Sequence, residues 1–307
     1  MNPILALIIT NIIWGAASPI FKFALTNIPP FTLAFIRFFF AGLIFLPLAA
    51  VFWRKTSLKD FFWIILAGFF GVTVNISFFF LGLPKTNSIN APVIASSGPV
   101  FLFLMSILFL KEKPKVKVFL GMMIALTGVL TIVLSPLIFN NQKLHWGEVE
   151  GNLFFVLATL GMVFQTLSAK KVLPKITPYQ VTAVSFLFGA FTFLPAMLKE
   201  LNYWSLADLN LHGWLGIVFG VFFSSALAYF LFYYGVSKIQ AQEVGLFTYI
   251  DPVVAVVIAV PLLGEYPNSF YFLGSLLVFG GIYIAEKRIH WHPFHRLKLK
   301  SENLKVL

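Results

Sequence analysis

The chain has no cysteine and few charged side chains. Without cysteine among its 307 residues, neither a disulfide framework nor a thiolate metal site can form. Charged residues make up 11% of the chain and hydrophobic residues 59%, with a mean hydropathy of +0.91, a balance that soluble domains of this length do not have. Neither a phosphate-binding loop nor an HExxH pattern is present. We therefore expect a membrane protein that is not an enzyme, with no cofactor, catalytic residue or metal site.

Long apolar runs dominate the sequence. Each is roughly 20 residues long, the length that an α-helix needs to cross a bilayer core. We expect an all-α integral membrane protein with ten transmembrane helices, the first of them a retained helix and not a cleaved signal peptide. The runs lie near 4–25, 31–53, 60–83, 88–110, 115–135, 147–168, 178–199, 211–234, 242–263 and 270–286.

The second half of the chain repeats the first, shifted by 153 positions. Five runs in each half is an odd number, so the two copies must cross the membrane in opposite directions. Many transporters are built from such inverted repeats, with the substrate site near the midplane between the halves. We expect repeats at 1–135 and 147–286, an inter-repeat loop at 136–146 and a basic cytoplasmic tail at 287–307. The identical pairs are Pro99/Pro252, Val100/Val253, Leu110/Leu263, Glu112/Glu265, Pro114/Pro267, Phe119/Phe272, Leu120/Leu273, Gly121/Gly274 and Gly128/Gly281.

Basic residues are distributed unevenly between the two sides. With the amino terminus placed inside, 17 of the 22 Lys and Arg residues fall on the inner side, and only Lys85, Lys143 and Lys199 fall outside. This bias predicts a multi-pass protein of the cell (inner) membrane with both termini in the cytoplasm. The net charge of +11 is then a matter of topology. We expect contact with membrane lipids and none with nucleic acid.

Asp251 is the sharpest functional candidate. It lies near the middle of the ninth run, where a carboxylate is costly and faces protein, water or a ligand. It could couple transport to protons or hold a substrate amine; the alternative is a structural carboxylate satisfied by a neighbouring helix. Pro99 and Pro252 occupy matching positions in the two halves, where they predict kinks that either allow gating or only shape the helices.

Polar residues form stripes on several runs. In the first run Asn11, Trp14, Ser18 and Lys22 follow i, i+3, i+7, i+11 spacing, which places them on one face. Such stripes either line a central cavity or support interhelical packing. The predicted substrate-binding residues are Asn11, Trp14, Ser18, Lys22, Asn75, Ser97, Gln165, Tyr229, Tyr233, Thr248 and Asp251.

Three further charged residues are predicted to be structural. Arg37 lies about six residues, roughly 9 Å, inside its run, so it should snorkel to the headgroups or find an ion-pair partner; recognition of a substrate carboxylate is the alternative. Glu112 and Glu265 end the fourth and ninth runs, where each can accept hydrogen bonds from the first turn of the next helix.

These motifs together resemble the drug/metabolite transporter (DMT) superfamily, in its EamA-like family. The likeness is carried by Trp14-Gly15 with Ser18-Pro19, by the stretch PFTLAFIR at 30–37, and by the duplicated Pro…Glu-x-Pro…Gly…Gly pattern. The resemblance implies two inverted five-helix repeats around a cavity lined by the first, third, fourth, sixth, eighth and ninth helices, with the fifth and tenth outside. Many relatives carry Trp where this chain has Gly161, which implies a roomier cavity.

The sequence therefore predicts a secondary transporter. We expect it to export a small organic solute, an amino acid or a similar amphipathic metabolite, by alternating access, with protons coupled through Asp251. An uncoupled facilitator and a membrane-embedded lipid-handling enzyme or flippase are the alternatives. A monomer or a homodimer fits the sequence equally well.

Overall fold

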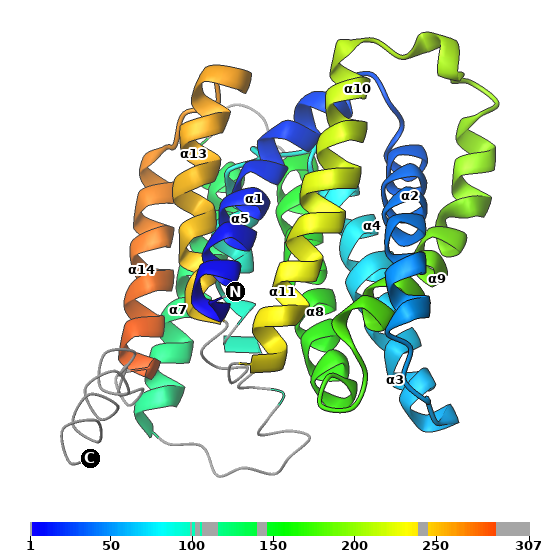
Figure 1. Ribbon diagram of the computed structural model, residues 1–307. Helices are drawn as coiled ribbons and strands as arrows, with labels where there is room; N and C mark the ends of the chain where they lie inside the picture. Colours follow the sequence, from blue (N-terminus) through cyan, green and yellow to red (C-terminus); the bar gives the residue numbers. More distant parts are fainter. Residues whose placement is uncertain are drawn as a thin grey trace, which may run out of the picture.

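The structure, a computed structural model, describes residues 2–98, 100–101, 105, 116–139, 146–238 and 245–286. All regular elements in these ranges are helices, and no strand occurs among them (Figure 1). Six helical stretches are long and apolar enough to cross a membrane, and shorter apolar helices accompany them. These findings confirm the all-α membrane class. The six stretches are Pro3–Ala24, Pro30–Val51, Leu58–Gly82, Trp146–Val172, Pro178–Glu200 and Leu211–Lys238.

Most helical elements overlap the predicted runs, but the fourth run, 88–110, is described only in part and contains α5 over six residues. The third, eighth and ninth runs each contain a segment of another helix type. The elements are α1 (Pro3–Ala24), α2 (Pro30–Val51), α3 (Leu58–Gly68), η1 (Phe69–Val74), α4 (Asn75–Gly82), α5 (Asn90–Ala95), α7 (Val116–Phe139), α8 (Trp146–Val172), α9 (Pro178–Glu200), η2 (Leu206–Asp208), α10 (Leu211–Val218), η3 (Phe219–Leu227), α11 (Ala228–Lys238), η4 (Gly245–Tyr249), α13 (Ile250–Leu263) and α14 (Ser269–Glu286).

Helix starts follow from local sequence. Both α2 and α9 begin with a proline, whose missing N–H is not needed in the first turn. The side chain of Thr177 caps α9 by accepting a hydrogen bond from the backbone N–H of Gln180. Ser57 caps α3 in the same way through the N–H of Asp60.

Two of the spanning stretches contain a π-helical segment, which the sequence did not predict. η1 joins α3 to α4, and η3 joins α10 to α11. A π-turn inserts extra backbone into an α-helix and is common at functional sites. η1 packs against α8 and α9, and η3 packs against α2 and α1, so both segments face neighbouring helices.

The predicted ninth run is not α-helical throughout, which corrects the expectation that Asp251 lies inside a single α-helix. A 3₁₀ segment, η4, precedes α13, and Asp251 lies in the first turn of α13. Pro252 explains the change, because its ring has no N–H and clashes with the carbonyl four residues earlier, that of Thr248. That carbonyl instead accepts a hydrogen bond from the hydroxyl of Ser96 at 3.2 Å.

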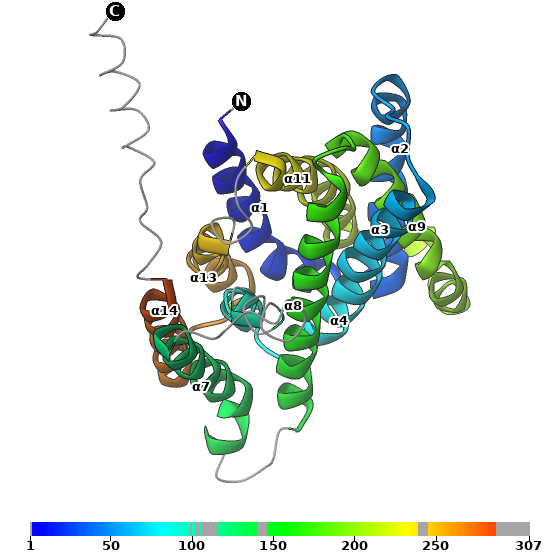
Figure 2. The same ribbon diagram turned by 90° about the horizontal axis from the view of Figure 1, so that it is seen from below.

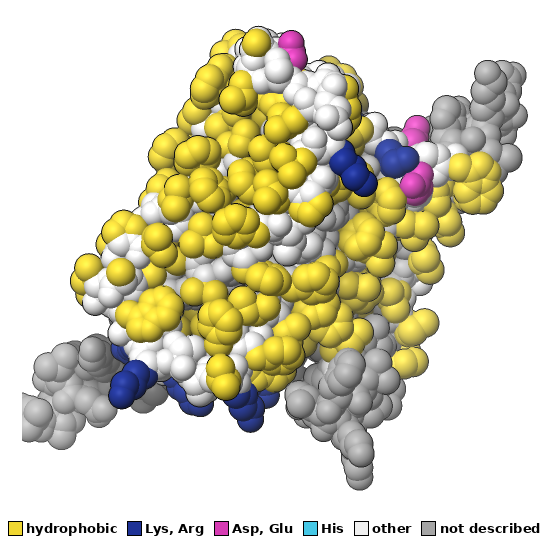
Figure 3. All heavy atoms as spheres, turned by 90° about the vertical axis from the view of Figure 1, so that its right-hand side faces the viewer, with side chains coloured by type: hydrophobic (Ala, Val, Ile, Leu, Met, Phe, Trp, Pro, Cys, Tyr) yellow, Lys and Arg dark blue, Asp and Glu magenta, His cyan; other side chains and the backbone are white. Residues whose placement is uncertain are grey.

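The helices form a bundle with a helix pair at each edge. Figures 1 and 2 show α7 beside α14 at one edge and α2 beside α9 toward the other, with α1, α8, α11 and α13 between them. Figure 3 shows a broad hydrophobic face, along the lower edge of which Lys and Arg side chains gather. Large apolar side chains such as Val257 and Leu276 are exposed on the outside, as expected for a surface that meets lipid.

The α7–α14 pair offers a test of packing. Gly281 of α14 faces the backbone of Gly121 and Ala125, so a Cβ there would clash with α7, whereas a Cβ on the adjacent Gly280 meets nothing within 4 Å. We expect Gly281→Ala to destabilise the protein by about 1–3 kcal/mol, the usual cost of overpacking. Gly280→Ala should leave stability unchanged or raise it, because alanine favours helix. Thermal unfolding in detergent measures the difference, and equal midpoints for the two variants would contradict this packing.

Candidate functional site

A cavity of about 110 Å³ lies between the two halves of the chain. Its lining comes from α1, α2, α4, α5 and α8, and from η3, α11, η4 and α13. No lining residue belongs to the described parts of α7 or α14. The lining residues are Trp14, Ala17, Ser18, Phe21, Arg37, Asn75, Ile76, Phe79, Ala91, Pro92, Ala95, Phe155, Ala158, Thr159, Met162, Gln165, Ser224, Tyr229, Thr248 and Asp251.

An aromatic wall is held by hydrogen bonds that cross between the halves. The indole N–H of Trp14 donates to the carbonyl of Ser224 at 3.2 Å, and the hydroxyl of Tyr229 donates to the carbonyl of Gly71, also at 3.2 Å. The two rings meet edge to face with centroids 5.1 Å apart. Both acceptor carbonyls belong to π-helical segments, so η1 and η3 fix the orientation of rings from the opposite half.

Asp251 is a buried carboxyl group in the cavity wall. Its Oδ1 atom has no hydrogen-bond partner within the described part of the chain. Helix α1 packs closely against it: a Cβ on Gly15 would lie 2.7 Å from the carbonyl oxygen of Asp251. No basic side chain of the described residues pairs with Asp251, and an unpaired carboxylate at such a position is costly unless a ligand or a proton reaches it.

Arg37 also lies in the cavity wall and is 1% exposed, so its side chain does not reach the surface. The guanidinium group lies over the rings of Phe21 and Phe38, 4.2 and 4.8 Å from their centroids. Nε donates to the hydroxyl of Ser225 at 3.2 Å and Nη2 to the hydroxyl of Ser224 at 3.1 Å. Nη1 has no partner, and no carboxylate of the described residues forms an ion pair with Arg37.

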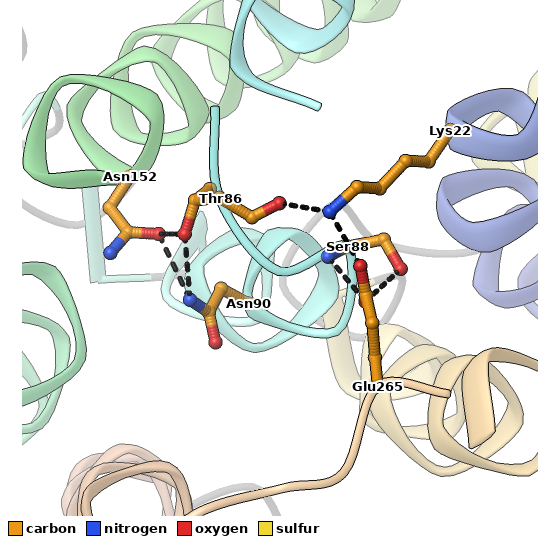
Figure 4. Close-up of polar contacts among 6 residues, drawn as sticks. All are labelled: Lys22, Thr86, Ser88, Asn90, Asn152 and Glu265. Atoms are coloured by element: carbon orange, nitrogen blue, oxygen red, sulfur yellow. Dashed lines mark hydrogen bonds and ion pairs between the residues drawn. The ribbon is translucent and has the colours of Figure 1, made fainter. Parts of the chain in front are cut away.

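A polar network, which we name the latch, joins α1, the α4–α5 connection and the residue after the α13 C-cap (Figure 4). It comprises Lys22, Thr86, Ser88 and Glu265. Lys22 forms an ion pair with Glu265 and donates to the carbonyl of Thr86 at 2.6 Å. The second carboxylate oxygen of Glu265 accepts bonds from the N–H and hydroxyl of Ser88, at 2.7 and 2.6 Å. The expectation that Glu265 accepts hydrogen bonds from the first turn of the next helix is therefore wrong, because its carboxylate binds Lys22 and Ser88 instead. Asn268 caps α14 by accepting from the N–H of Tyr271.

The latch continues into α8. The hydroxyl of Thr86 donates to the side-chain oxygen of Asn152 at 3.0 Å, and the amide of Asn90 donates to the same oxygen at 3.0 Å (Figure 4). Asn152 in turn donates to the carbonyl of Ile132 in α7 at 3.2 Å. One continuous set of bonds thus ties α1, α5, α7 and α8 to the α4–α5 connection and to the residue after the α13 C-cap, at the end of the bundle where α1 and α13 terminate.

Of the predicted substrate-binding residues, four lie away from the cavity lining. Lys22 belongs to the latch, and the amide of Asn11 donates to the carbonyl of Leu7 within its own helix at 2.7 Å. Ser97 bonds to a carbonyl one turn earlier. The hydroxyl of Tyr233 lies one layer behind the wall, where it accepts a bond from Gln165 at 2.9 Å. The other seven line the cavity: Trp14, Ser18, Asn75, Gln165, Tyr229, Thr248 and Asp251.

Four further residues from the sequence analysis have different outcomes. Pro252 lies in the first turn of α13, while Pro99 and Glu112 lie outside the described residues. Gly161 does not enlarge the cavity as expected, because α8 packs directly on the third helical stretch there: a Cβ on Gly161 would lie 2.8 Å from the carbonyl oxygen of Phe70.

Sequence reasoning missed the serine pair that holds Arg37. Ser225 shares a helical face with Tyr229, four positions later, whereas Ser224 does not, since neighbours on an α-helix point about 100° apart. Both serines lie in η3, where both hydroxyls reach the same guanidinium group. Two adjacent serines in an otherwise apolar run were the one available signal.

Comparison with known proteins agrees with this architecture. The model of the EamA-like transporter family matches residues 1–134 and 149–286. The chain is 27% identical to the uncharacterized transporter YetK of Bacillus subtilis, over 88% of this chain and 82% of that protein. It is 29% identical to an uncharacterized transporter of Archaeoglobus fulgidus, over 94% and 100%, and 27% identical to an S-adenosylmethionine uptake transporter of Rickettsia bellii, over 84% of each.

A solved structure has the same fold. It superposes with a TM-score of 0.66 at 17% sequence identity and covers 95% of this chain and 98% of its own. Because the family model covers both halves of the chain, and because the relatives it matches along most of their length are transporters, this multi-pass membrane protein belongs to the EamA-like transporter family of the drug/metabolite transporter superfamily.

Proposed function

We propose that the protein is a secondary transporter that moves a small organic metabolite, an amino acid or a similar amphipathic solute, by alternating access. The observation that carries the proposal is the cavity itself, which both halves of the chain line and whose wall contains the buried carboxyl group of Asp251, with its Oδ1 atom unpartnered among the described residues. Ten helices in two inverted repeats, with both termini in the cytoplasm, would place this cavity near the membrane midplane.

Asp251 is the proposed coupling residue. It lies at the start of α13, directly after the 3₁₀ segment, and faces the cavity with one oxygen unbonded. A carboxyl group in this position can bind a proton on one side of the membrane and release it on the other. The proposed direction of transport is export. The proposed driving force is either the solute gradient or exchange for protons.

The latch is proposed to close the outer end of the cavity. Its carboxylate, Glu265, is 8% exposed and holds both α1 and the α4–α5 connection. By the predicted topology this end faces outward, so opening to the outside must separate Lys22 and Ser88 from Glu265. The closed latch therefore favours the state that is shut toward the outside.

Solute flux into proteoliposomes tests the proposed transport and its coupling to protons. Uptake of labelled amino acids, nucleosides and S-adenosylmethionine into proteoliposomes, with and without a pH gradient, should reveal a solute whose accumulation follows the gradient. Asp251→Asn should abolish proton-coupled transport without loss of membrane insertion, because an amide side chain does not take up a proton at the pH values of such an assay. Asp208→Asn, in the exposed loop before α10, serves as the control and should behave as wild type.

The outcomes separate the alternatives. Equilibration that ignores pH and survives in Asp251→Asn would replace the coupled carrier with an uncoupled facilitator. A purified protein that moves no member of the panel would contradict the transport proposal.

Labelling of a thiol in the cavity wall tests the latch. Since the chain has no cysteine, Ser18→Cys places a single thiol in the cavity wall. A membrane-impermeant maleimide added from outside should label it slowly, and Glu265→Gln should speed labelling several-fold by weakening the bonds to Lys22 and Ser88. Glu150→Gln is the matched control, because Glu150 pairs with Lys85 at 2.8 Å in an exposed site. Equal labelling in the two variants would refute the latch.

A further inference from the structure

We propose that Arg37 is an anion-binding site in the cavity and that the carboxylate of the transported solute binds there. The inference rests on the proposed transport function and deepens it, because it names the chemical group that the solute must carry. Its starting point is that Arg37 lines the cavity, is 1% exposed and has one nitrogen, Nη1, without a hydrogen-bond partner among the described residues.

No carboxylate of the described residues forms an ion pair with Arg37. Glu200 is occupied at the start of α2, where it accepts bonds from the N–H of Phe31 and from Thr32. Glu265 belongs to the latch. Asp251 shares the cavity, but no ion pair joins it to Arg37 among the described residues. A buried cation without a counter-ion is costly. An anionic ligand that binds Arg37 would therefore gain binding free energy by pairing with this charge.

The guanidinium group is held in a fixed orientation. The hydroxyls of Ser224 and Ser225 bind Nη2 and Nε, and the rings of Phe21 and Phe38 lie against it. Two hydroxyl acceptors and two ring faces thus hold the group, and Nη1 is the nitrogen that they leave without a partner among the described residues. A carboxylate is the planar acceptor that such a preorganised fork suits best.

Arg37 and Asp251 reach the cavity from different elements, α2 and α13. Because Arg37 and Asp251 form no ion pair with each other, a ligand that carries both a negative and a positive charge could pair with both. A zwitterionic amino acid would place its carboxylate at Arg37 and its ammonium group at Asp251. The geometry thus points to solutes with a free carboxylate, and away from their amides and decarboxylated amines.

A matched ligand series tests the proposal on the wild-type protein. Phenylalanine, phenylalaninamide and phenethylamine, and the same three forms of leucine, compete with the labelled solute that the flux panel identifies. Their effect on the melting midpoint of the detergent-purified protein is a second readout that needs no flux. We expect the acids to bind about tenfold or more tightly than the amides or amines, because a charge-assisted bond is lost.

Variants then assign the preference to Arg37. Arg37→Gln should remove the difference between acid and amide, and Arg37→Lys, which keeps the charge without the fork, should retain part of it. Lys85→Gln, which removes an exposed cation that is not part of the cavity lining, is the control and should keep the full preference. If Arg37→Gln does not fold, the wild-type series still decides.

The results distinguish this inference from the transport proposal. Amines or amides that move and bind as well as the acids would overturn the role of Arg37 and leave transport standing. An acid preference that persists unchanged in Arg37→Gln would also overturn it. Acids that stabilise the protein selectively, but no solute that moves, would support the site and overturn transport.

Discussion

A bilayer core offers no water to a peptide group, so each interruption of a helix needs a donor from elsewhere in the protein. In this bundle the donor comes from the opposite half. Tyr229 donates to the carbonyl of Gly71 in η1, and Trp14 donates to a carbonyl of η3. Ser96 donates to the carbonyl of Thr248, which Pro252 leaves without its helical partner. The irregular turns around the cavity therefore also hold the two halves together.

Charge is used differently at the ends of the bundle and at its centre. At the ends, Glu200 is satisfied by the first turn of α2 and Glu265 by Lys22 and Ser88. In the cavity wall, Arg37 and Asp251 each retain an atom without a partner. A protein that only needed stability would pair such groups or replace them with apolar ones. Their unsatisfied atoms in one cavity are the physical basis of both proposals.

Several features could be read from the sequence because they depend on local order. Hydrophobic run length identified the spanning stretches, proline marked the starts of α2 and α9, and the duplicated motif indicated the family. Helical spacing also placed Trp14 and Ser18 on one face, and both line the cavity. Periodicity gives the face of a helix, but it does not say which helix covers that face.

The remaining features were decided by tertiary structure, because they join residues far apart in the chain. Lys22 shares a face with Trp14, yet it pairs with Glu265, 243 positions away, at the end of the bundle. Arg37 reads as a snorkelling residue, yet η3 brings two serine hydroxyls to it and keeps it buried. The sequence by itself determined the all-α membrane class, the six long apolar stretches and the family. Only packing between the halves decided which polar groups of the described residues are satisfied and which are left without a partner, because that depends on distances between separate helices.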